Sequence, residues 1–301
     1  MINTFKASII TIQETKHTRP GVIKLPGYQT FEKVRSNKGG GGLLTSVDED
    51  LNPVLVSQGN DDNVEILVVE ADLGSKKIRI INGYGPQEDE DINVTLSFWQ
   101  EFESEIIKAK DNGCLILIEM DANAKLGDTI IKEDPNKMTR NGKLLMDVIK
   151  RQNLVITNSL ELCKGTITRE RIFENKVEKS VIDYILICEE LSRHIVEVTI
   201  DEDRIYTLSR YLKRKAGKRV IPSDHNILFS KFNIEFERKS KKLRKEFFQF
   251  KCESGRKCFL EETNVSNKLS SCFLIDDNFE KSSNSFFKTL KGTFHKYFQK
   301  I

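Results

Sequence analysis

Residues 115–127 read LILIEMDANAKLG, and their pattern recurs along most of the chain. The first four residues are apolar and two of them are β-branched, which is typical of a short buried strand. An acid and an amide, Asp121 and Asn123, follow this run directly. Because a strand end holds polar side chains on a rigid scaffold, the stretch predicts a strand that leads into a functional site.

Seven further apolar runs, each bounded by turn residues, also favour strands. They are ASIITIQE (7–14), GGLLTSV (41–47), EILVVEADL (65–73), KIRIINGYG (77–85), NLVITNS (153–159), SVIDYILI (180–187) and HNILFSKF (225–232). Residues 94–113 and 142–153 instead place apolar residues at helical spacing and end near Asn or Asn-Gly, as helices often do. Eight strands and two helices predict an α+β sandwich.

Length and composition describe a globular chain with one large domain or two small ones. The 301 residues are 38% hydrophobic and 31% charged, with a net charge of +3. The sequence contains no apolar run long enough to span a membrane and no secretory signal at its start, so we expect an intracellular, non-secreted protein, with the nucleus as a candidate location. The six cysteines lack CxxC spacing and are expected to be reduced thiols.

The charge is divided unevenly along the chain. Residues 231–301 hold 16 basic and 9 acidic residues and 12 of the 18 phenylalanines, whereas residues 1–230 hold 32 basic and 36 acidic residues. We therefore expect a domain over 1–231 and a basic, Phe-rich tail over 232–301 that is helical or partly disordered. A linker or remnant is favoured for the tail over a nucleic-acid contact through its Lys, Arg and Phe side chains.

Several polar residues lie in or beside the predicted strands: Glu14, Asp121, Asn123, Asp183, Asp224 and His225. A lone carboxylate at such a place is most often a turn or cap residue. Asp183, however, is flanked by apolar residues in SVIDYILI, and a buried carboxylate needs a compensating partner, which a histidine would supply. Together these groups have the chemistry of a metal-assisted phosphodiester hydrolase. The run GGGGLL (39–44) lacks the Lys-Ser/Thr of a phosphate loop and is expected to be a flexible turn into a strand.

Five motifs occur in the order found in the endonuclease/exonuclease/phosphatase superfamily: IQETK (12–16), NGYGPQ (82–87), MDANAKLG (120–127), SVIDYIL (180–186) and SDHNIL (223–228). Over residues 1–231 the chain most resembles the endonuclease domain of non-LTR retrotransposons and the craniofacial development protein 2-like host proteins. The resemblance implies a four-layered α/β sandwich, in which two mainly antiparallel sheets are flanked by helices. Only 13 residues precede Glu14, so the first strand of that fold is expected to be absent.

The resemblance also implies roles for individual residues. Glu14 would be the principal Mg²⁺ ligand, with Mn²⁺ as an alternative ion, and Asp224 would assist it. Asp121 would orient or deprotonate the attacking water, while Asp183 would fix the ring of His225. Tyr84 would hydrogen-bond the scissile phosphate, and Asn123 would donate to the phosphate oxygens. Three further residues would support the site: Asn158, Thr166 and Ser180. Gln87 stands where many members carry Asn.

The predicted function is that of a DNA endonuclease that nicks its substrate with metal-activated water. Two alternatives remain open at this stage. One is a catalytically impaired module that binds nucleic acid or protein, and the other is a phosphatase that acts on a small phosphoester.

Overall fold

A computed structural model describes residues 7–17, 19–21, 23–35, 41–59, 64–173, 176–205, 223–234, 248–250 and 298–300. The chain divides into two compact units, Met1–Lys239 and Ser240–Ile301. In the second unit the described residues form an antiparallel pair, β15 (Phe248–Phe250) and β16 (Phe298–Lys300). The rest of the tail, for which a helical or partly disordered state was expected, lies outside the described residues.

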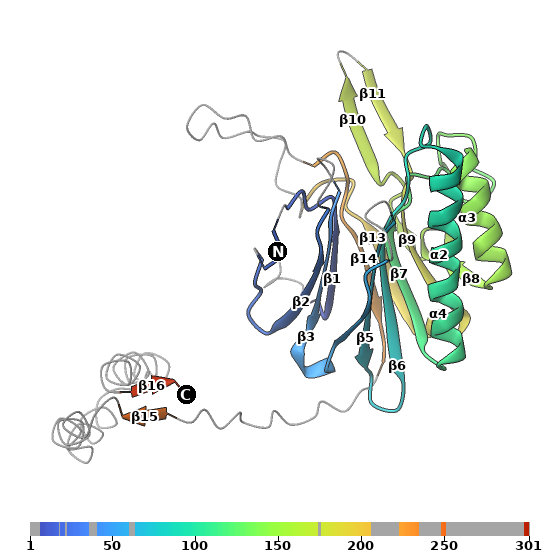
Figure 1. The fold of residues 1–301 in the computed structure, drawn as a ribbon. Coiled ribbons are helices and arrows are strands. Elements are labelled where there is room, and N and C mark those ends of the chain that lie inside the picture. The colour runs from blue at the N-terminus through green and yellow to red at the C-terminus, as the bar shows by residue number, and fades with distance from the viewer. Residues whose placement is uncertain are drawn as a thin grey trace, which may run out of the picture. The chain divides into compact units, whose positions relative to one another are not determined.

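A six-stranded sheet forms the centre of the first unit (Figure 1). Its order is β4 (Val54–Ser57), β5 (Glu65–Asp72), β6 (Lys77–Tyr84), β7 (Leu115–Asp121), β12 (Asp183–Cys188) and β8 (Leu154–Ile156). The β6–β7 pair is parallel and the other neighbours are antiparallel. The apolar runs of β5, β6, β7 and β12 are almost wholly buried because both faces of the sheet are covered.

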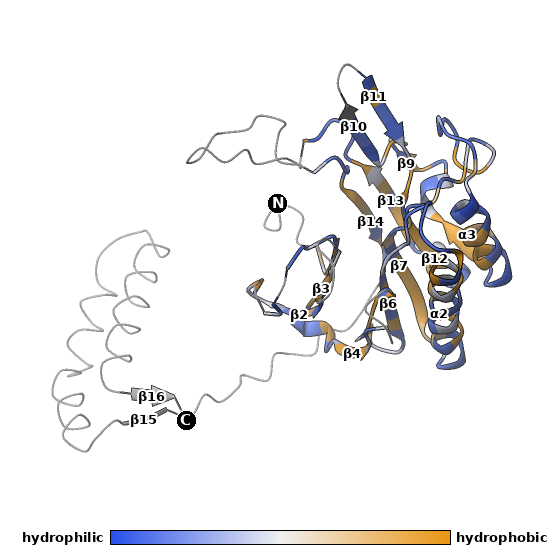
Figure 2. Ribbon diagram, turned by 45° about the horizontal axis from the view of Figure 1, so that its top comes forward, coloured by the Kyte–Doolittle hydropathy of each residue, from blue (hydrophilic) through white to orange (hydrophobic). Residues whose placement is uncertain are grey.

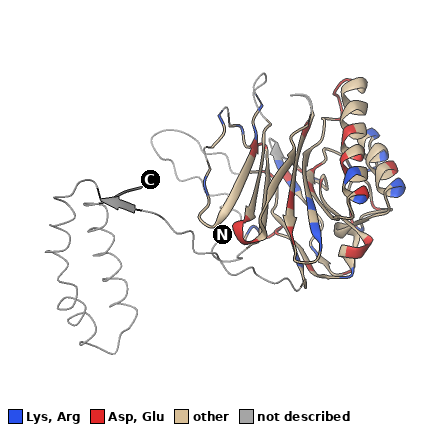
Figure 3. Ribbon diagram, turned by 60° about the horizontal axis from the view of Figure 1, so that its bottom comes forward, with Lys and Arg blue, Asp and Glu red and all other residues tan. Residues whose placement is uncertain are grey.

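Two helices cover one face of this sheet: α2 (Ile92–Asp111) and α3 (Arg140–Arg151). The helix α2 buries Phe98, Trp99 and Phe102 against the sheet, where Phe98 stacks on Phe102 and Trp99 meets both rings edge-on. Asp91 caps α2 by accepting a hydrogen bond from Asn93 N–H, at 2.8 Å. Charged residues of both signs lie along the two helices, at the right of Figure 3, as expected for helices with one solvent-facing side.

The other face packs against two three-stranded sheets. One has the order β1 (Ile9–Gln13), β3 (Leu43–Asp48), β2 (Tyr28–Lys33), and the other β14 (Leu228–Phe232), β13 (Ile195–Ile200), β9 (Cys163–Lys164). Both contribute to one apolar layer against the central sheet, with Ile9 and Phe31 from the first and Leu228 and Phe232 from the second. Within the described part of the chain, β1 and β14 are edge strands. The absence of a first strand before β1 stays a prediction.

The remaining elements are short. A hairpin of β10 (Arg169–Phe173) and β11 (Lys176–Ser180) projects from the layers, and Figure 2 shows β11 as hydrophilic. The helix α4 (Glu189–Ser192) follows β12, and two 3-10 turns, η1 (Glu49–Leu51) and η2 (Thr157–Ser159), link strands. The described cysteines, Cys114, Cys163 and Cys188, are free thiols. Among the described helices, none has the length and apolar character that crossing a membrane requires.

The predicted α+β sandwich of two mainly antiparallel layers is confirmed. Of its two outer faces, the long described helices cover the one beside the six-stranded sheet.

Candidate active site

Two acidic residues lie side by side at one end of the central sheet. Asp121 ends β7 and Asp183 begins β12, and the antiparallel register pairs these two residues directly. Asp121 is only 5% exposed. Such a pair of carboxylates repels itself unless a cation or hydrogen-bond donors lie close by.

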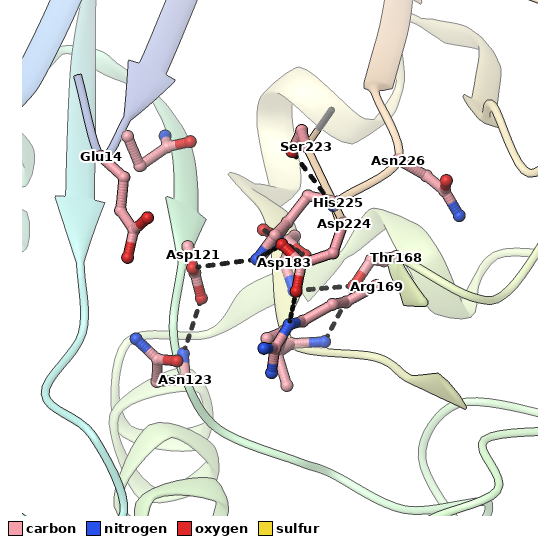
Figure 4. A network of polar contacts seen from close by, with 12 residues as sticks. Glu14, Asp121, Asn123, Thr168, Arg169, Asp183, Ser223, Asp224, His225 and Asn226 are labelled. Carbon is pink, nitrogen blue, oxygen red and sulfur yellow. Dashed lines mark hydrogen bonds and ion pairs between the residues drawn. The ribbon is translucent and has the colours of Figure 1, made fainter. Parts of the chain in front are cut away.

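His225 supplies a donor to Asp183. It lies just before β14, and its ring Nδ1 is 2.9 Å from Oδ1 and 3.0 Å from Oδ2 of Asp183. Its Nε2 faces the opposite way and lies 3.9 Å from carboxylate oxygens of both Asp121 and Asp224 (Figure 4). Burial alone would lower the pKa of His225, but the charge and hydrogen bond of Asp183, together with the charges of the other two acids, raise it to about 9. The imidazole is therefore held as a cation at neutral pH.

Burial and the charge of Asp183 raise the pKa of Asp121, although His225 and a hydrogen bond from the backbone of Asn123 act in the opposite direction. This backbone N–H donates to Oδ1 of Asp121 over 3.0 Å. Asn123 itself has a left-handed φ of 46°, and its side-chain amide donates to the carbonyl of Gly85 at 2.9 Å. The turn after β7 thus fixes Asp121 and keeps the amide of Asn123 beside it.

Glu14 approaches from the small sheet that contains β1, and Figure 4 shows it across from Asp121. Its carboxylate accepts a hydrogen bond of 2.5 Å from the Tyr84 hydroxyl and lies 3.1 Å from the ammonium of Lys16. Burial would raise the pKa of Glu14, but these two partners outweigh it and lower that pKa. Burial and the bond to Glu14 raise the pKa of Tyr84, so this hydroxyl stays protonated and remains a donor. The Gln87 amide donates to the same hydroxyl over 3.2 Å.

Arg169 and Thr168, which the sequence reasoning missed, hold the His225 segment in place. Arg169 Nε donates to Asp224 Oδ2 over 2.8 Å, and burial of Asp224 is outweighed by this bond, so that its pKa is lowered. The Thr168 hydroxyl accepts the N–H groups of Ile182 and Asp183, while its carbonyl accepts the N–H of Asn226. Thr168 therefore ties the strand that bears Asp183 to the segment that bears His225.

The three predicted supporting residues have different surroundings. Asn158 grips β12 through both ends of its amide, donating to the carbonyl of Asp183 at 3.0 Å and accepting from Ile185 N–H. Ser180 is buried at the end of β11, where its carbonyl accepts from Thr168 N–H. The backbone N–H of Thr166 donates to the Glu202 carboxylate. The hydroxyl that accepts from the Asp183 backbone belongs to Thr168, two residues further on.

The acidic site suits a divalent cation. A carboxylate oxygen of Asp121, one of Asp183 and a ring nitrogen of His225 lie within 4.8 Å of one another. Because the ring is held as a cation, the carboxylates are the groups of this cluster that could bind a metal ion. The two residues expected as ligands, Glu14 and Asp224, have lowered pKa values and stay ionised, as metal ligands must. Burial, and after it the charge of Asp183, raise the pKa of Asp121, and a cation at the site would offset both effects.

No protein-family model matches the sequence, and neither does any curated protein. Solved structures do match, and the chain has the fold of the endonuclease/exonuclease/phosphatase superfamily. One similar structure is the endonuclease domain of TRAS1, a telomere-specific non-LTR retrotransposon, at 22% identity and a TM-score of 0.55, covering 78% of this chain and 90% of that chain. Two others are the catalytic domain of Xenopus laevis APE2, at 17% identity, a TM-score of 0.57 and coverage of 77% and 85%, and an AP endonuclease from Archaeoglobus fulgidus, at 17% identity, a TM-score of 0.54 and coverage of 77% and 91%.

Proposed function

We propose that this protein is a Mg²⁺-dependent DNA endonuclease of the non-LTR retrotransposon type. The observation that carries the proposal is the convergence of Asp121, Asp183 and His225 at one end of the sandwich, where a carboxylate oxygen or ring nitrogen of each lies within 4.8 Å of the others. The fold shared with the TRAS1 endonuclease domain supports this reading. We propose the DNA-nicking function for residues 1–231, an intracellular location and a separate tail over 232–301.

We assign the cation to Glu14 and Asp224, the ligands that the resemblance implies, because both carboxylates stay ionised, as metal ligands must. A Mg²⁺ ion held by these carboxylates would supply Lewis-acid stabilisation of the negative charge that develops during the displacement. The Tyr84 hydroxyl, which donates to Glu14, orients this carboxylate.

Asp121 takes the proton of the attacking water, since its raised pKa lies closer to neutrality than that of an ordinary aspartate. The water oxygen forms a bond to phosphorus as the bond from phosphorus to the 3′ oxygen breaks. The leaving oxygen then takes up a proton and becomes a 3′-hydroxyl. His225, held as a cation by Asp183, directs Nε2 towards the site and stabilises the charge that develops on the phosphoryl oxygens. The amide of Asn123 adds a neutral donor beside Asp121.

The test is nicking of supercoiled plasmid in Mg²⁺. Asp121→Ala should abolish nicking, whereas Asp111→Ala, the same substitution at an exposed site on α2, should leave it unchanged. Equal nicking by parent and Asp121→Ala would overturn the assignment. Turnover of an inositol phosphate in place of the plasmid would favour the small-phosphoester alternative.

A further inference from the structure

The backbone that carries Glu14 is held in a strained conformation. Glu14 and Lys16 have φ values of 52° and 55°, in the left-handed region. For a residue other than glycine this region costs about 1–2 kcal/mol. Two such residues in three positions persist only if neighbouring groups fix them.

Gly41 and Gly42 supply the fixing contacts. The N–H of Thr15 donates to the carbonyl of Gly42 over 3.1 Å, and the N–H of Lys16 donates to the carbonyl of Gly41 over 2.8 Å. Both glycines have positive φ values, 72° and 90°, and a Cβ on Gly42 would lie 2.5 Å from the Thr15 hydroxyl. The end of the glycine run is thus more than a flexible turn, because it forms two hydrogen bonds with the residues that follow Glu14.

The buried carboxylate of Glu65 contacts this pair of glycines. It is 3% exposed, and its Oε1 accepts a hydrogen bond of 2.5 Å from the N–H of Gly42. The guanidinium of Arg35 lies 3.7 Å from its other oxygen. A Cβ on Gly41 would lie 2.5 Å from the same carboxylate, so a side chain there would displace Glu65, and the φ of 72° would strain any residue other than glycine. Glu65 also pairs in register with Tyr84, whose hydroxyl donates to Glu14.

We propose that Glu65 is a positioning residue that acts through Gly41 and Gly42 to fix the backbone and carboxylate of Glu14. The Glu65 carboxylate accepts the backbone N–H of Gly42, and Gly41 and Gly42 in turn accept the N–H groups of the residues that follow Glu14. An apolar residue in place of Glu65 could not make the first of these bonds. The positioning rests on the proposed function only in so far as Glu14 binds the metal ion.

Three variants test the inference. Glu65→Ala removes the acceptor of Gly42 N–H, Glu65→Gln keeps an acceptor of the same size, and Glu105→Ala removes a buried glutamate of α2 as a matched control. The first readout is amide hydrogen exchange at Thr15 and Lys16, followed by NMR without metal. We expect Glu65→Ala to speed exchange at both amides at least tenfold, Glu65→Gln to restore most of the protection, and Glu105→Ala to leave both rates unchanged.

The second readout is Mn²⁺ binding measured by calorimetry. Glu65→Ala should weaken binding on the order of tenfold to a hundredfold, as loss of a group that orients a ligand does. Unchanged exchange in Glu65→Ala, or an equal effect in Glu105→Ala, would overturn the positioning role even if the parent binds Mn²⁺ and nicks DNA. If the parent neither binds nor nicks, the proposed function fails, and the exchange rates still decide the role of Glu65.

Discussion

The charge of His225 depends mainly on Asp183, and Asp183→Asn measures that dependence. The pKa of His225 is raised from 6.5 to about 9, a difference that corresponds to about 3 kcal/mol in favour of the imidazolium. Asp183 touches the ring at 2.9 Å, whereas Asp121 and Asp224 lie at 3.9 Å. Because Asp183 adds a charged hydrogen bond at the shortest distance, we assign it more than half of this energy, about 2 kcal/mol.

The assay is an NMR pH titration of the histidine ring carbons in the parent and in Asp183→Asn. We expect the pKa of His225 to fall by about 1.5 in this variant. Asp224→Asn removes the same charge from a more distant neighbour, so it should lower that pKa by less than about 0.5. A His225 pKa that is unchanged in Asp183→Asn, or that falls further in Asp224→Asn, would refute the reasoning.

The free energy of unfolding should depend on pH through the same pair, His225 and Asp183. The folded-state pKa of His225 lies above its unfolded value, so the folded protein binds the proton more tightly. The stabilisation is therefore complete below pH 6.5 and is lost as the pH rises through about 9. Urea unfolding of the parent should show this decline, and Asp183→Asn should show a smaller one. A parent whose stability rises over this interval would contradict the sign.

Three further outcomes are expected. Chelation with EDTA should abolish nicking, and Mg²⁺ at 100 times its Kd should raise the free energy of unfolding by about 2.7 kcal/mol, measured by thermal melting; a melting temperature indifferent to Mg²⁺ would exclude a folded-state site. Phe102→Ala should lower the free energy of unfolding by about 3–5 kcal/mol, because Phe102 is fully buried, whereas Ile107→Ala, at a residue 43% exposed on the same helix, should cost far less; equal losses in a urea titration would show that the buried cluster is misassigned. Gly85→Ala would place a Cβ 2.2 Å from the carbonyl of Ala122, so it should lower the free energy of unfolding by about 1–3 kcal/mol and slow plasmid nicking. Gly83→Ala, whose Cβ would have its nearest contact at 3.5 Å, should have a smaller effect on both unfolding and nicking.

The fold was largely predictable because the central strands of the six-stranded sheet are continuous apolar runs in the sequence. The strands β10 and β11 were not, since RERIF and KVEKS are mostly polar and pair with each other in a hairpin that projects from the layers. The strand β13 was also missed, although IVEVTI alternates apolar and polar residues and could have been read as a strand. Backbone pairing thus stabilised strands that hydrophobicity alone did not mark.

Part of the site followed from elementary electrostatics. The expected burial of Asp183 called for a partner, and the structure, in which Asp183 is partly buried, brings His225 to it from 42 residues away. Arg169 and Thr168 could not be found in this way, because polar residues in a polar hairpin look solvent-exposed until the chain folds. From the sequence, the glycine run indicated only a flexible turn. The contact that favours glycine at position 41 is with the Glu65 carboxylate, which is distant in sequence and comes close only in the folded chain.

The groups that we propose to be catalytic are carried by two different layers of the sandwich. Asp121 and Asp183 end strands of the central sheet, whereas Glu14 follows β1 and His225 precedes β14 in the opposing sheets. The apolar layer that includes Leu117 and Phe31 separates these sheets, so its thickness acts as a spacer that sets the opening across which the phosphate must fit. Because packed cores transmit volume changes, a methylene added deep in this layer would change the width of the site without touching any residue in it.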